Sequence, residues 1–425
     1  MTVIFSKHNL NYGYQSKCQV CGNKDLNNII NLGLQPPCDS LINLKEKDYF
    51  NESYFPLNFV WCKKCTLGQI DYAVDPSLLF YPEYPYRSGI TSTLANNLIS
   101  TAESIFKNYN YDLKKYALDI GSNDGTLLKG FKKKGMKVIG VEPTNISKIA
   151  NKNSIFTINS FFTYKLTKKI LKKYGKASII TGANVFAHIA NLGDLLKGVK
   201  QLLNEDGIFV TESHYLLDII KTTQYDSIYH EHLKYYSLKS IMILLKDYKL
   251  KVFHVERIPN YGGSIRIYAA NINNKKAKVN NSISKLLNLE KRLGLYKLNT
   301  YKLFGQKIKK NRKDLNKLLT NILGKNKSLC GVGAPGRAST LLNYCGISKF
   351  ILPYIIEQSS CLKLNMLIPG SHIPIIDEKE IIKKQPDYLL FLSWHYWKPI
   401  LKNIRSKGIK SNIILPLPKV KIINY

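Results

Sequence analysis

Two pairs of cysteines have the spacing of a metal-binding site. Cys18 and Cys21 form one Cys-x-x-Cys pair, and Cys62 and Cys65 form a second. Each such turn points two thiolates to the same side, so two turns together can complete a tetrahedral four-thiolate zinc site. A zinc ion with four protein ligands has no open position for chemistry. We therefore predict a structural zinc site, with the reaction centre elsewhere.

Two other interpretations of these pairs stay open. One is a redox-active Cys-x-x-Cys, although that motif usually occurs once, at the start of a helix that follows a strand. The other is four buried cysteines that bind no metal. The remaining cysteines have no ligand spacing and are predicted to be core thiols: Cys38, Cys330, Cys345 and Cys361.

A short segment carries a different kind of chemistry. Residues 229–232 are Tyr-His-Glu-His, consecutive side chains that can all exchange protons. A carboxylate beside a histidine can fix its tautomer and stabilise the imidazolium formed when it accepts a proton. Helical zinc motifs place two histidines four residues apart, whereas His230 and His232 are separated by a single residue. We therefore favour a general-base loop over a metal site, and a surface loop without function is the alternative.

A glycine-rich turn indicates a nucleoside-binding site. Residues 117–128 read Ala-Leu-Asp-Ile-Gly-Ser-Asn-Asp-Gly-Thr-Leu-Leu, so the turn is Gly-x-x-x-Gly and not the Gly-x-Gly-x-x-Gly of dinucleotide folds. Its acidic side chains would repel a pyrophosphate but suit the sulfonium and amino groups of S-adenosylmethionine (SAM). Glu142 ends the next predicted strand, where an acidic residue accepts the ribose hydroxyls. We favour SAM over NAD. The predicted cofactor residues are Asp119, Gly121, Asn123, Asp124, Gly125, Glu142 and Asn184.

Two further segments supply candidate contacts. Asn184 and His188 follow the fourth predicted strand, and the carboxyl ends of parallel strands line the ligand crevice; a surface or capping histidine is the alternative for His188. Gly262 and Gly263 precede Ser264 and Arg266. Glycines permit close backbone approach to a ligand and arginine can bind phosphate through two hydrogen bonds, although a turn that opens an ordinary strand fits equally well.

Alternating apolar runs and helical patterns are expected to position these residues. The pattern indicates an α/β fold in which a parallel sheet carries helices on both faces. Helices are expected over residues 92–109 and, rich in lysine, over 282–323. The predicted strands are 116–120, 137–141, 154–158, 177–181 and 207–211, followed by a second series at 328–333, 352–356, 387–392 and 412–415. We predict a zinc-binding lobe (1–80), a Rossmann-like SAM-binding domain (81–275) and a Rossmann-like C-terminal domain with its helical linker (276–425).

The chain is strongly basic. It has 425 residues, with 63 Lys and Arg against 29 Asp and Glu, a net charge of +34. The basic residues are scattered over every region instead of forming a stripe, so nucleic-acid binding is disfavoured. A positive field attracts anionic small molecules such as nucleotides. No apolar run approaches about 18 residues and the start lacks the apolar core of a signal peptide, so we expect a cytoplasmic protein without a membrane partner.

Taken in order, these segments resemble those of three-domain sugar C-methyltransferases that act on nucleotide-linked keto-deoxysugars. The resemblance rests on the cysteine pairs, the Asp-Ile-Gly-Ser-Asn-Asp-Gly turn, Ala-Asn-Val-Phe-Ala-His (183–188), Tyr-His-Glu-His, Gly-Gly-Ser-Ile-Arg, and residues 331–343 and 368–374 of the C-terminal domain. It implies a zinc lobe, a SAM-binding domain, and a C-terminal domain that helps to enclose a nucleotide sugar.

The resemblance also implies roles for individual residues. His232 would abstract the proton next to a ketone, and the enediolate carbon would attack the methyl group. A ring carbon becomes nucleophilic only as an enolate, so a base and an oxyanion stabiliser are both needed. The other implied catalytic residues are Tyr229, Glu231, His188 and Tyr86. The implied substrate-binding residues are Ser264, Arg266, Arg337 and His372.

Three segments depart from the family pattern. Tyr261 stands where a histidine is expected, Gly-Arg-Ala-Ser (336–339) replaces a Lys-Gly-Asn-like turn, and Ser-Trp-His (393–395) replaces a Pro-Trp-Asn-like end. The departures bear on the substrate more than on the reaction type. Two other functions stay open: O- or N-methylation of another small molecule, which needs no base for a carbon-bound proton, and a zinc-containing RNA-binding or RNA-modifying protein. We expect a monomer.

Overall fold

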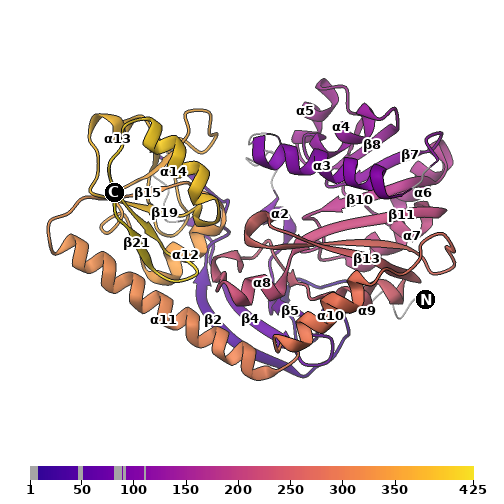
Figure 1. Ribbon diagram of the computed structural model, residues 1–425, viewed down its shortest axis with the longest axis horizontal. Coiled ribbons are helices and arrows are strands. Elements are labelled where there is room, and N and C mark those ends of the chain that lie inside the picture. Colours follow the sequence, from indigo (N-terminus) through magenta and orange to yellow (C-terminus); the bar gives the residue numbers. More distant parts are fainter. Residues whose placement is uncertain (1–7, 46–50, 81–88, 90–91, 110–111) are drawn as a thin grey trace.

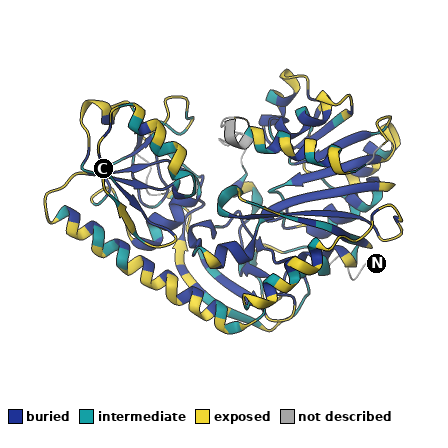
Figure 2. Ribbon diagram, viewed as in Figure 1, coloured by how far each residue is buried: buried dark blue, intermediate teal, exposed yellow. Residues whose placement is uncertain are grey.

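The computed structural model describes residues 8–45, 51–80, 89, 92–109 and 112–425. Figure 1 shows two sheet-containing domains side by side, with the N-terminal lobe between and beneath them. The strands at the centre of each sheet are buried, and exposed residues line the outer face of the long helix α11 (Leu298–Leu323; Figure 2). No helix among the described residues is both long and apolar enough to cross a membrane.

The N-terminal lobe is built on a four-stranded antiparallel sheet, in the order β12-β5-β4-β2. Its outermost strand, β12 (Lys234–Tyr235), comes from the segment that follows Tyr-His-Glu-His. The lobe also pairs with the C-terminal domain, through β3 with β17. The other elements of the lobe and β17 are β1 (Gly13–Tyr14), β2 (Leu26–Gln35), β3 (Ile42–Asn43), β4 (Phe55–Cys62), β5 (Gly68–Ile70), β6 (Tyr72–Ala73), α2 (Pro76–Leu79) and β17 (Met366–Leu367).

The central domain has a seven-stranded sheet in the order β13-β14-β11-β10-β7-β8-β9, and β14 runs antiparallel to both of its neighbours. The parallel strands read as continuous apolar runs because helices cover both faces. All five residues of β7 are buried. The strands are β7 (Tyr116–Ile120), β8 (Lys137–Glu142), β9 (Thr157–Asn159), β10 (Ala177–Ala183), β11 (Leu203–His214), β13 (Leu250–Ile258) and β14 (Ser264–Asn271).

Helices pack on both sides of this sheet (Figure 1). The α-helices are α3 (Ser92–Asn108), α4 (Thr126–Lys133), α5 (Ile146–Lys152), α6 (Tyr164–Tyr174), α7 (Leu192–Leu202), α8 (Leu216–Lys221) and α9 (Leu238–Asp247), and short 3₁₀ turns cover Tyr225–Ser227 and Asn260–Gly262. The strands predicted at 116–120, 137–141, 177–181 and 207–211 are present. The strand predicted at 154–158 is only partly correct, because the strand there begins at Thr157.

The C-terminal domain has a six-stranded sheet in the order β18-β16-β15-β19-β20-β21, parallel except for β21. The strands predicted at 328–333, 387–392 and 412–415 are present, and β20 has the predicted bounds. The prediction at 352–356 is partly wrong, because the strand there begins only at Ile355. The elements are β15 (Leu329–Val332), α12 (Arg337–Cys345), β16 (Ile355–Glu357), β18 (Ile375–Asp377), α13 (Glu380–Lys383), β19 (Tyr388–Phe391), the 3₁₀ turn Trp394–Tyr396, α14 (Trp397–Ser406), β20 (Asn412–Leu415) and β21 (Lys421–Ile423).

The predicted helical linker is two helices and not one. α10 (Ser282–Arg292) ends before Gly294, whose φ of 74° favours glycine, and α11 begins at Leu298. The inner face of α11 packs on the N-terminal lobe: Tyr301 stacks on Trp61 with ring centroids 4.4 Å apart. Gly305 lies so close to the lobe that a Cβ there would be 2.7 Å from the Ile29 carbonyl oxygen. The linker thus braces the lobe against both domains.

Candidate active site and metal centre

The four predicted metal ligands lie together. The Sγ atoms of Cys18, Cys21, Cys62 and Cys65 are all within 4.8 Å of one another. Cys18 and Cys65 are separated by 3.4 Å, and Cys21 and Cys62 by 3.5 Å. A tetrahedral Zn–thiolate site has sulfur atoms about 3.8 Å apart, so the cluster fits a four-thiolate zinc ion. All but Cys21 are buried, which fits a closed structural site.

The zinc lobe supports the loop that carries Tyr-His-Glu-His (residues 229–232), which we call the base loop. Tyr235 of β12 pairs with Gly68 of β5, six residues after Cys62, and Ile70 N donates to the Leu233 carbonyl at 3.2 Å. The buried Lys234 donates from Nζ to the Ile189 carbonyl at 2.8 Å, and burial lowers its pKa to about 7. The lobe therefore fixes the base loop and, through Lys234, the segment after His188.

The predicted cofactor turn joins β7 to α4. Gly121 and Gly125 have φ values of 64° and 78°, which glycine adopts without strain. A Cβ on Gly121 would lie 2.8 Å from Val185 Cγ2, so the backbone must stay bare there. Asp119 is buried and accepts a hydrogen bond from Thr181 at 2.6 Å. Burial raises the pKa of Asp119 to about 7, and the nearby Glu142 adds to the shift.

The other two acidic residues among the predicted cofactor residues, Asp124 and Glu142, stabilise the turn between β7 and α4 through hydrogen bonds. Asp124 accepts from the Thr126 hydroxyl at 2.6 Å and from Gly89 N at 2.8 Å. Glu142 accepts from Asn123 N at 3.0 Å with Oε2 and from Thr144 with Oε1. These bonds fix Asn123 in a left-handed conformation with φ of 49°. The two carboxylates thus shape the site, whether or not they also contact a ligand.

Unsatisfied polar atoms mark the space beside this turn. Ser122 Oγ and Asn184 Oδ1 are buried and have no hydrogen-bond partner among the described residues. Buried polar atoms without a partner are those that a bound ligand would satisfy. A small hollow opens at the same place, lined by Leu98, Asp119, Gly121, Ser122, Thr126, Leu127 and Ala183. The residues present therefore fit a small polar cofactor such as SAM.

His232 has a defined tautomer. Its Nδ1 lies 3.0 Å from the Ser227 carbonyl oxygen and its Nε2 lies 2.8 Å from the Tyr229 hydroxyl. A carbonyl oxygen only accepts, so Nδ1 carries the proton and Nε2 offers a lone pair to the tyrosine O–H. Burial lowers the pKa of His232 well below its ordinary value, and the nearby His188 and His214 add to this. His232 is thus a neutral imidazole with its basic nitrogen on the ε side.

Two other histidine rings, those of His188 and His214, contact His232 edge to face, and the three residues form the histidine cluster. The ring centroids of His188 and His232 are 4.8 Å apart, and those of His214 and His232 are 4.9 Å apart. Burial lowers the pKa of His188 to about 4 and that of His214 to about 3. The sequence analysis missed His214, the last residue of β11. The rule that selected Asn184, a polar residue at the end of a strand, would have found it had the strand been extended by three residues.

Glu231 faces the zinc lobe. Cys38 donates to Glu231 Oε1 at 3.3 Å, and Asp39 lies in the same buried cluster. Both ring nitrogens of His232 already have other partners. The predicted support of the base by Glu231 is therefore not a hydrogen bond to the imidazole ring. Tyr229 and Ser227 provide those bonds instead.

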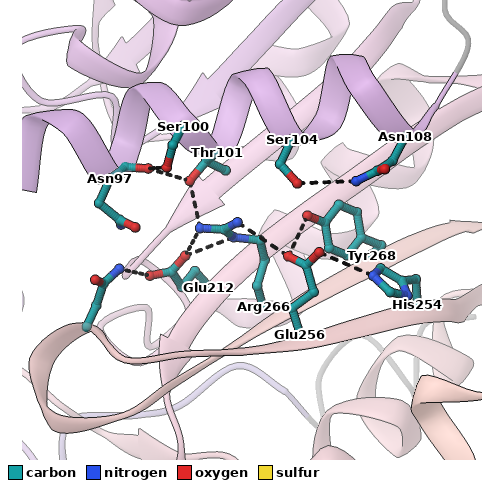
Figure 3. Close-up of polar contacts among 11 residues, drawn as sticks. Asn97, Ser100, Thr101, Ser104, Asn108, Glu212, His254, Glu256, Arg266 and Tyr268 are labelled. Carbon is teal, nitrogen blue, oxygen red and sulfur yellow. Dashed lines mark hydrogen bonds and ion pairs between the residues drawn. The ribbon is translucent and has the colours of Figure 1, made fainter.

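Arg266 does not offer its guanidinium to a substrate in this structure (Figure 3). Strand register places it directly opposite Glu212 on one side and Glu256 on the other. It donates to Glu212 Oε2 at 2.8 Å and 3.0 Å, to Glu256 at 3.4 Å and to Thr101 of α3 at 2.7 Å. The arginine is buried, and this network attaches α3 to the sheet. The geometry gives no support to the predicted phosphate contact of Arg266.

Ser264 is likewise turned inward, and His372 has a partner in the zinc lobe. The fully buried Ser264 donates to the Asn260 carbonyl at 3.2 Å. His372 lies 2.5 Å from Glu52 Oε2, and Gly370 N donates to the other oxygen of Glu52 at 2.8 Å. His372 thus joins the lobe to the C-terminal domain. The predicted catalytic residue Tyr86 lies outside the described residues.

Arg337 belongs to the C-terminal domain and contacts the segment that precedes the base loop. It begins α12 and donates to Gln224 Oε1 at 3.3 Å and to His395 Nδ1 at 3.2 Å. It also forms an ion pair with Asp226 at 3.5 Å. Gln224 in turn donates to the Gly262 carbonyl at 2.8 Å, next to Tyr261, whose ring contacts His214. From this position the charge of Arg337 lowers the pKa values of His214 and His232. Two of the predicted substrate-binding residues therefore lie near the cluster: Arg337, with its charged side chain, and Ser264, whose backbone pairs with that of His214.

The strand order of the central sheet and the site at its carboxyl edge define a methyltransferase with a Rossmann-like fold. Family models match three consecutive parts of the chain: a zinc binding domain (residues 18–80), a methyltransferase domain (97–255) and a C-methyltransferase C-terminal domain (259–418). The chain is 30% identical to the C-methyltransferase NovU of Streptomyces niveus over 412 residues, which cover 96% of this chain and 97% of NovU.

The chain therefore belongs to the family of SAM-dependent C-methyltransferases that combine these three domains. This confirms the resemblance to three-domain C-methyltransferases and favours C-methylation over the O- or N-methylation and RNA-binding alternatives.

Solved structures match less than half of the chain, at lower similarity. PH0226 of Pyrococcus horikoshii is 15% identical with a TM-score of 0.34, covering 45% of this chain and 97% of that chain. The magnesium protoporphyrin IX methyltransferase ChlM of Synechocystis, with bound SAH, is 11% identical with a TM-score of 0.33, covering 44% and 90%. At such TM-scores we draw no functional conclusion from either.

Proposed function

We propose that this C-methyltransferase acts on a nucleotide-linked 4-keto-deoxysugar and that His232 removes the proton beside the ketone. The observation that carries the proposal is the tautomer of His232: Nδ1–H is bound to a backbone carbonyl, and Nε2 keeps its lone pair. A neutral imidazole in a fixed orientation is suited to general-base catalysis near neutral pH. The negative charge that develops on the substrate would favour the imidazolium that forms.

The cofactor side of the site fits SAM. When bound, SAM supplies an electrophilic methyl group. Asp119, the turn between Gly121 and Gly125, Glu142 and Asn184 would hold it, and the unpartnered Asn184 Oδ1 would gain a hydrogen bond. Residues 183–188 connect this hollow with the histidine cluster, because Ala183 lines the hollow and His188 contacts His232. The reacting carbon would therefore lie between the two.

Arg337 supports an anionic substrate. Its buried guanidinium reaches from the C-terminal domain to the edge of the histidine cluster, where it forms a loose ion pair of 3.5 Å with Asp226. A guanidinium can bind phosphate oxygens through paired hydrogen bonds. The net charge of +34 would also draw a nucleotide-linked sugar toward the protein. His188 is a further candidate, since its buried Nδ1 has no partner among the described residues.

Replacement of His232 by Asn tests the proposal. Loss of a general base should lower methyl transfer to TDP-4-keto-6-deoxyglucose by about 10²–10⁴-fold, as followed by mass spectrometry of the sugar. His254→Asn is the matched control, because His254 of β13 hydrogen-bonds Ser282 of α10 and Glu256 of β13 and lies outside the histidine cluster. If His232→Asn retains wild-type activity while zinc content and thermal unfolding are unchanged, His232 is not the base.

A further inference from the structure

His214 occupies a place in the reaction centre that the family motifs do not assign. It is the last residue of β11, where its backbone pairs with Ser264 of β14. The carboxyl ends of the parallel strands open toward the ligand crevice in this type of sheet. Its ring contacts His232 edge to face on one side and Tyr261 on the other, with centroids 4.9 Å and 5.4 Å apart. His214 therefore lies directly beside the proposed base.

The imidazole of His214 has hydrogen-bonding capacity to spare. The residue is mostly but not fully buried, and within the described part of the chain neither ring nitrogen has a hydrogen-bond partner. His232, in contrast, uses both ring nitrogens. A neutral imidazole always has one N–H, so His214 can donate one hydrogen bond to a ligand that enters the site.

The surroundings of His214 keep it neutral. Burial, Arg337 and His188 all disfavour its protonation. A neutral imidazole is an effective donor to a carbonyl oxygen that becomes negative, because it does not give up its proton entirely. Tyr261 holds a left-handed backbone conformation, with φ of 53°, that places its ring against His214. The ring of His214 is thus held between Tyr261 and His232.

We propose that His214 donates a hydrogen bond to the ketone oxygen of the substrate and stabilises the enolate formed there; this rests on the function proposed above. His232 Nε2 takes the proton from the carbon next to the ketone. The C–H electron pair becomes the new carbon–carbon double bond, and the carbonyl π pair moves to oxygen. When the enolate carbon forms its bond to the methyl group, the C=O bond is restored, the S–CH₃ bond breaks and its electron pair stays on sulfur. The donor of His214 acts on the oxygen throughout.

The test measures enolisation without methyl transfer. The zinc-loaded protein is incubated with TDP-4-keto-6-deoxyglucose in heavy water without SAM, and deuterium entering the sugar is followed by NMR. His214→Phe keeps a flat ring of similar size but has no N–H. Loss of one oxyanion donor lowers a rate by about 10²–10³-fold. We expect this loss in the maximal exchange rate, with little change in half-saturation by the sugar, because the bond strengthens as charge develops.

A second variant and a control complete the design. His214→Gln retains an N–H donor and should recover part of the rate, whereas a purely structural role would not depend on the donor. His254→Gln should exchange deuterium within about twofold of wild type, because its ring hydrogen-bonds Ser282 and Glu256 and lies outside the histidine cluster. Exchange by His214→Phe at the wild-type rate would overturn the role of His214 alone. If the wild type itself shows no exchange, the proposed function fails, and the role of His214 fails with it.

Discussion

The hydroxyl of Tyr229 lies 2.8 Å from Nε2 of His232, the nitrogen that would accept the substrate proton. Tyr229 is partly exposed, whereas His232 is buried. The hydroxyl of the tyrosine therefore occupies the basic nitrogen of His232 in this structure. The hydroxyl fixes the ring of His232; if His232 is the base, as proposed, the hydroxyl would have to turn aside or pass its proton on before Nε2 could accept the substrate proton.

Tyr229→Phe should consequently have a smaller effect than His232→Gln. The phenylalanine keeps the ring contact but removes the hydrogen bond that orients Nε2, so we expect exchange to fall about tenfold, against 10²-fold or more for the loss of the base. Rates of deuterium exchange of both variants, measured side by side, check this. A Tyr229→Phe protein that loses as much as His232→Gln would make Tyr229 part of the proton transfer itself.

Removal of the zinc site should weaken the active site as well as the lobe. Cys62 is one of the four thiolates, and β5, close to it in sequence, pairs with β12 of the base loop. The Cys62→Ser protein should lose the bound zinc, unfold at a lower Tm and exchange deuterium into the sugar more slowly. Cys330→Ser, a buried thiol outside the cluster, is the control that should keep its zinc. One zinc per wild-type chain is expected by elemental analysis, and a wild-type chain without zinc would contradict the site.

A methyl group on Gly121 should impair SAM binding. Gly121 and Gly135 both have positive φ, at 64° and 82°, so alanine is strained at either position. Only at Gly121 would the Cβ collide with a neighbour, Val185. Gly135→Ala should cost about 1 kcal/mol of stability and bind SAM normally. Gly121→Ala should also bind SAM at least tenfold more weakly by calorimetry. Equal affinities in the two variants would place the cofactor elsewhere.

The histidine cluster should make stability depend on pH. The pKa of His214 is about 3 in the folded protein, against about 6.5 in an unfolded chain. Between these values the unfolded chain binds a proton that the folded chain does not. The free energy of unfolding is therefore highest above about pH 6.5 and falls as the pH falls toward 4. His188 acts in the same direction, whereas Asp119, with its raised pKa, acts in the opposite one.

A variant isolates the contribution of one ring. In urea denaturation between pH 4.5 and 6, His214→Phe should show a pH slope smaller than that of the wild type by about 1.4 kcal/mol per pH unit. The comparison cancels the other titrating groups, zinc thiolates included. Parallel slopes would show that His214 titrates normally in the folded protein.

The sequence predicted the elements whose signal is local. Buried parallel strands are apolar throughout, so β7 and β20 were found with their bounds, and the paired cysteines indicated the metal centre. The base loop was found because its four titratable side chains are adjacent in sequence. The break between α10 and α11 was missed, because lysine-rich helical periodicity continues on both sides of Gly294.

Contacts between distant segments could not be read from the sequence. Arg266 was predicted to contact a substrate, because the sequence does not show the strand register that places Glu212 and Glu256 on either side of it. Glu212 is 54 residues away in the chain. The pairing of β12 with β5, which links the base loop to the zinc lobe, is of the same kind. The inward turn of Glu231 toward Cys38 likewise depends on how the lobe docks. Pattern and spacing reveal residue types, whereas partners depend on the tertiary fold.

The most direct test of C-methylation through an enolate is one incubation with both substrates. TDP-4-keto-6-deoxyglucose and SAM are incubated with the protein in heavy water, and the sugar is then reduced, released from the nucleotide and examined by NMR and mass spectrometry. We predict one added methyl group bound to a ring carbon next to the former ketone, and deuterium at the same carbon when SAM is omitted. A methyl group on oxygen, or no transfer by a protein that binds SAM, would contradict the proposed reaction.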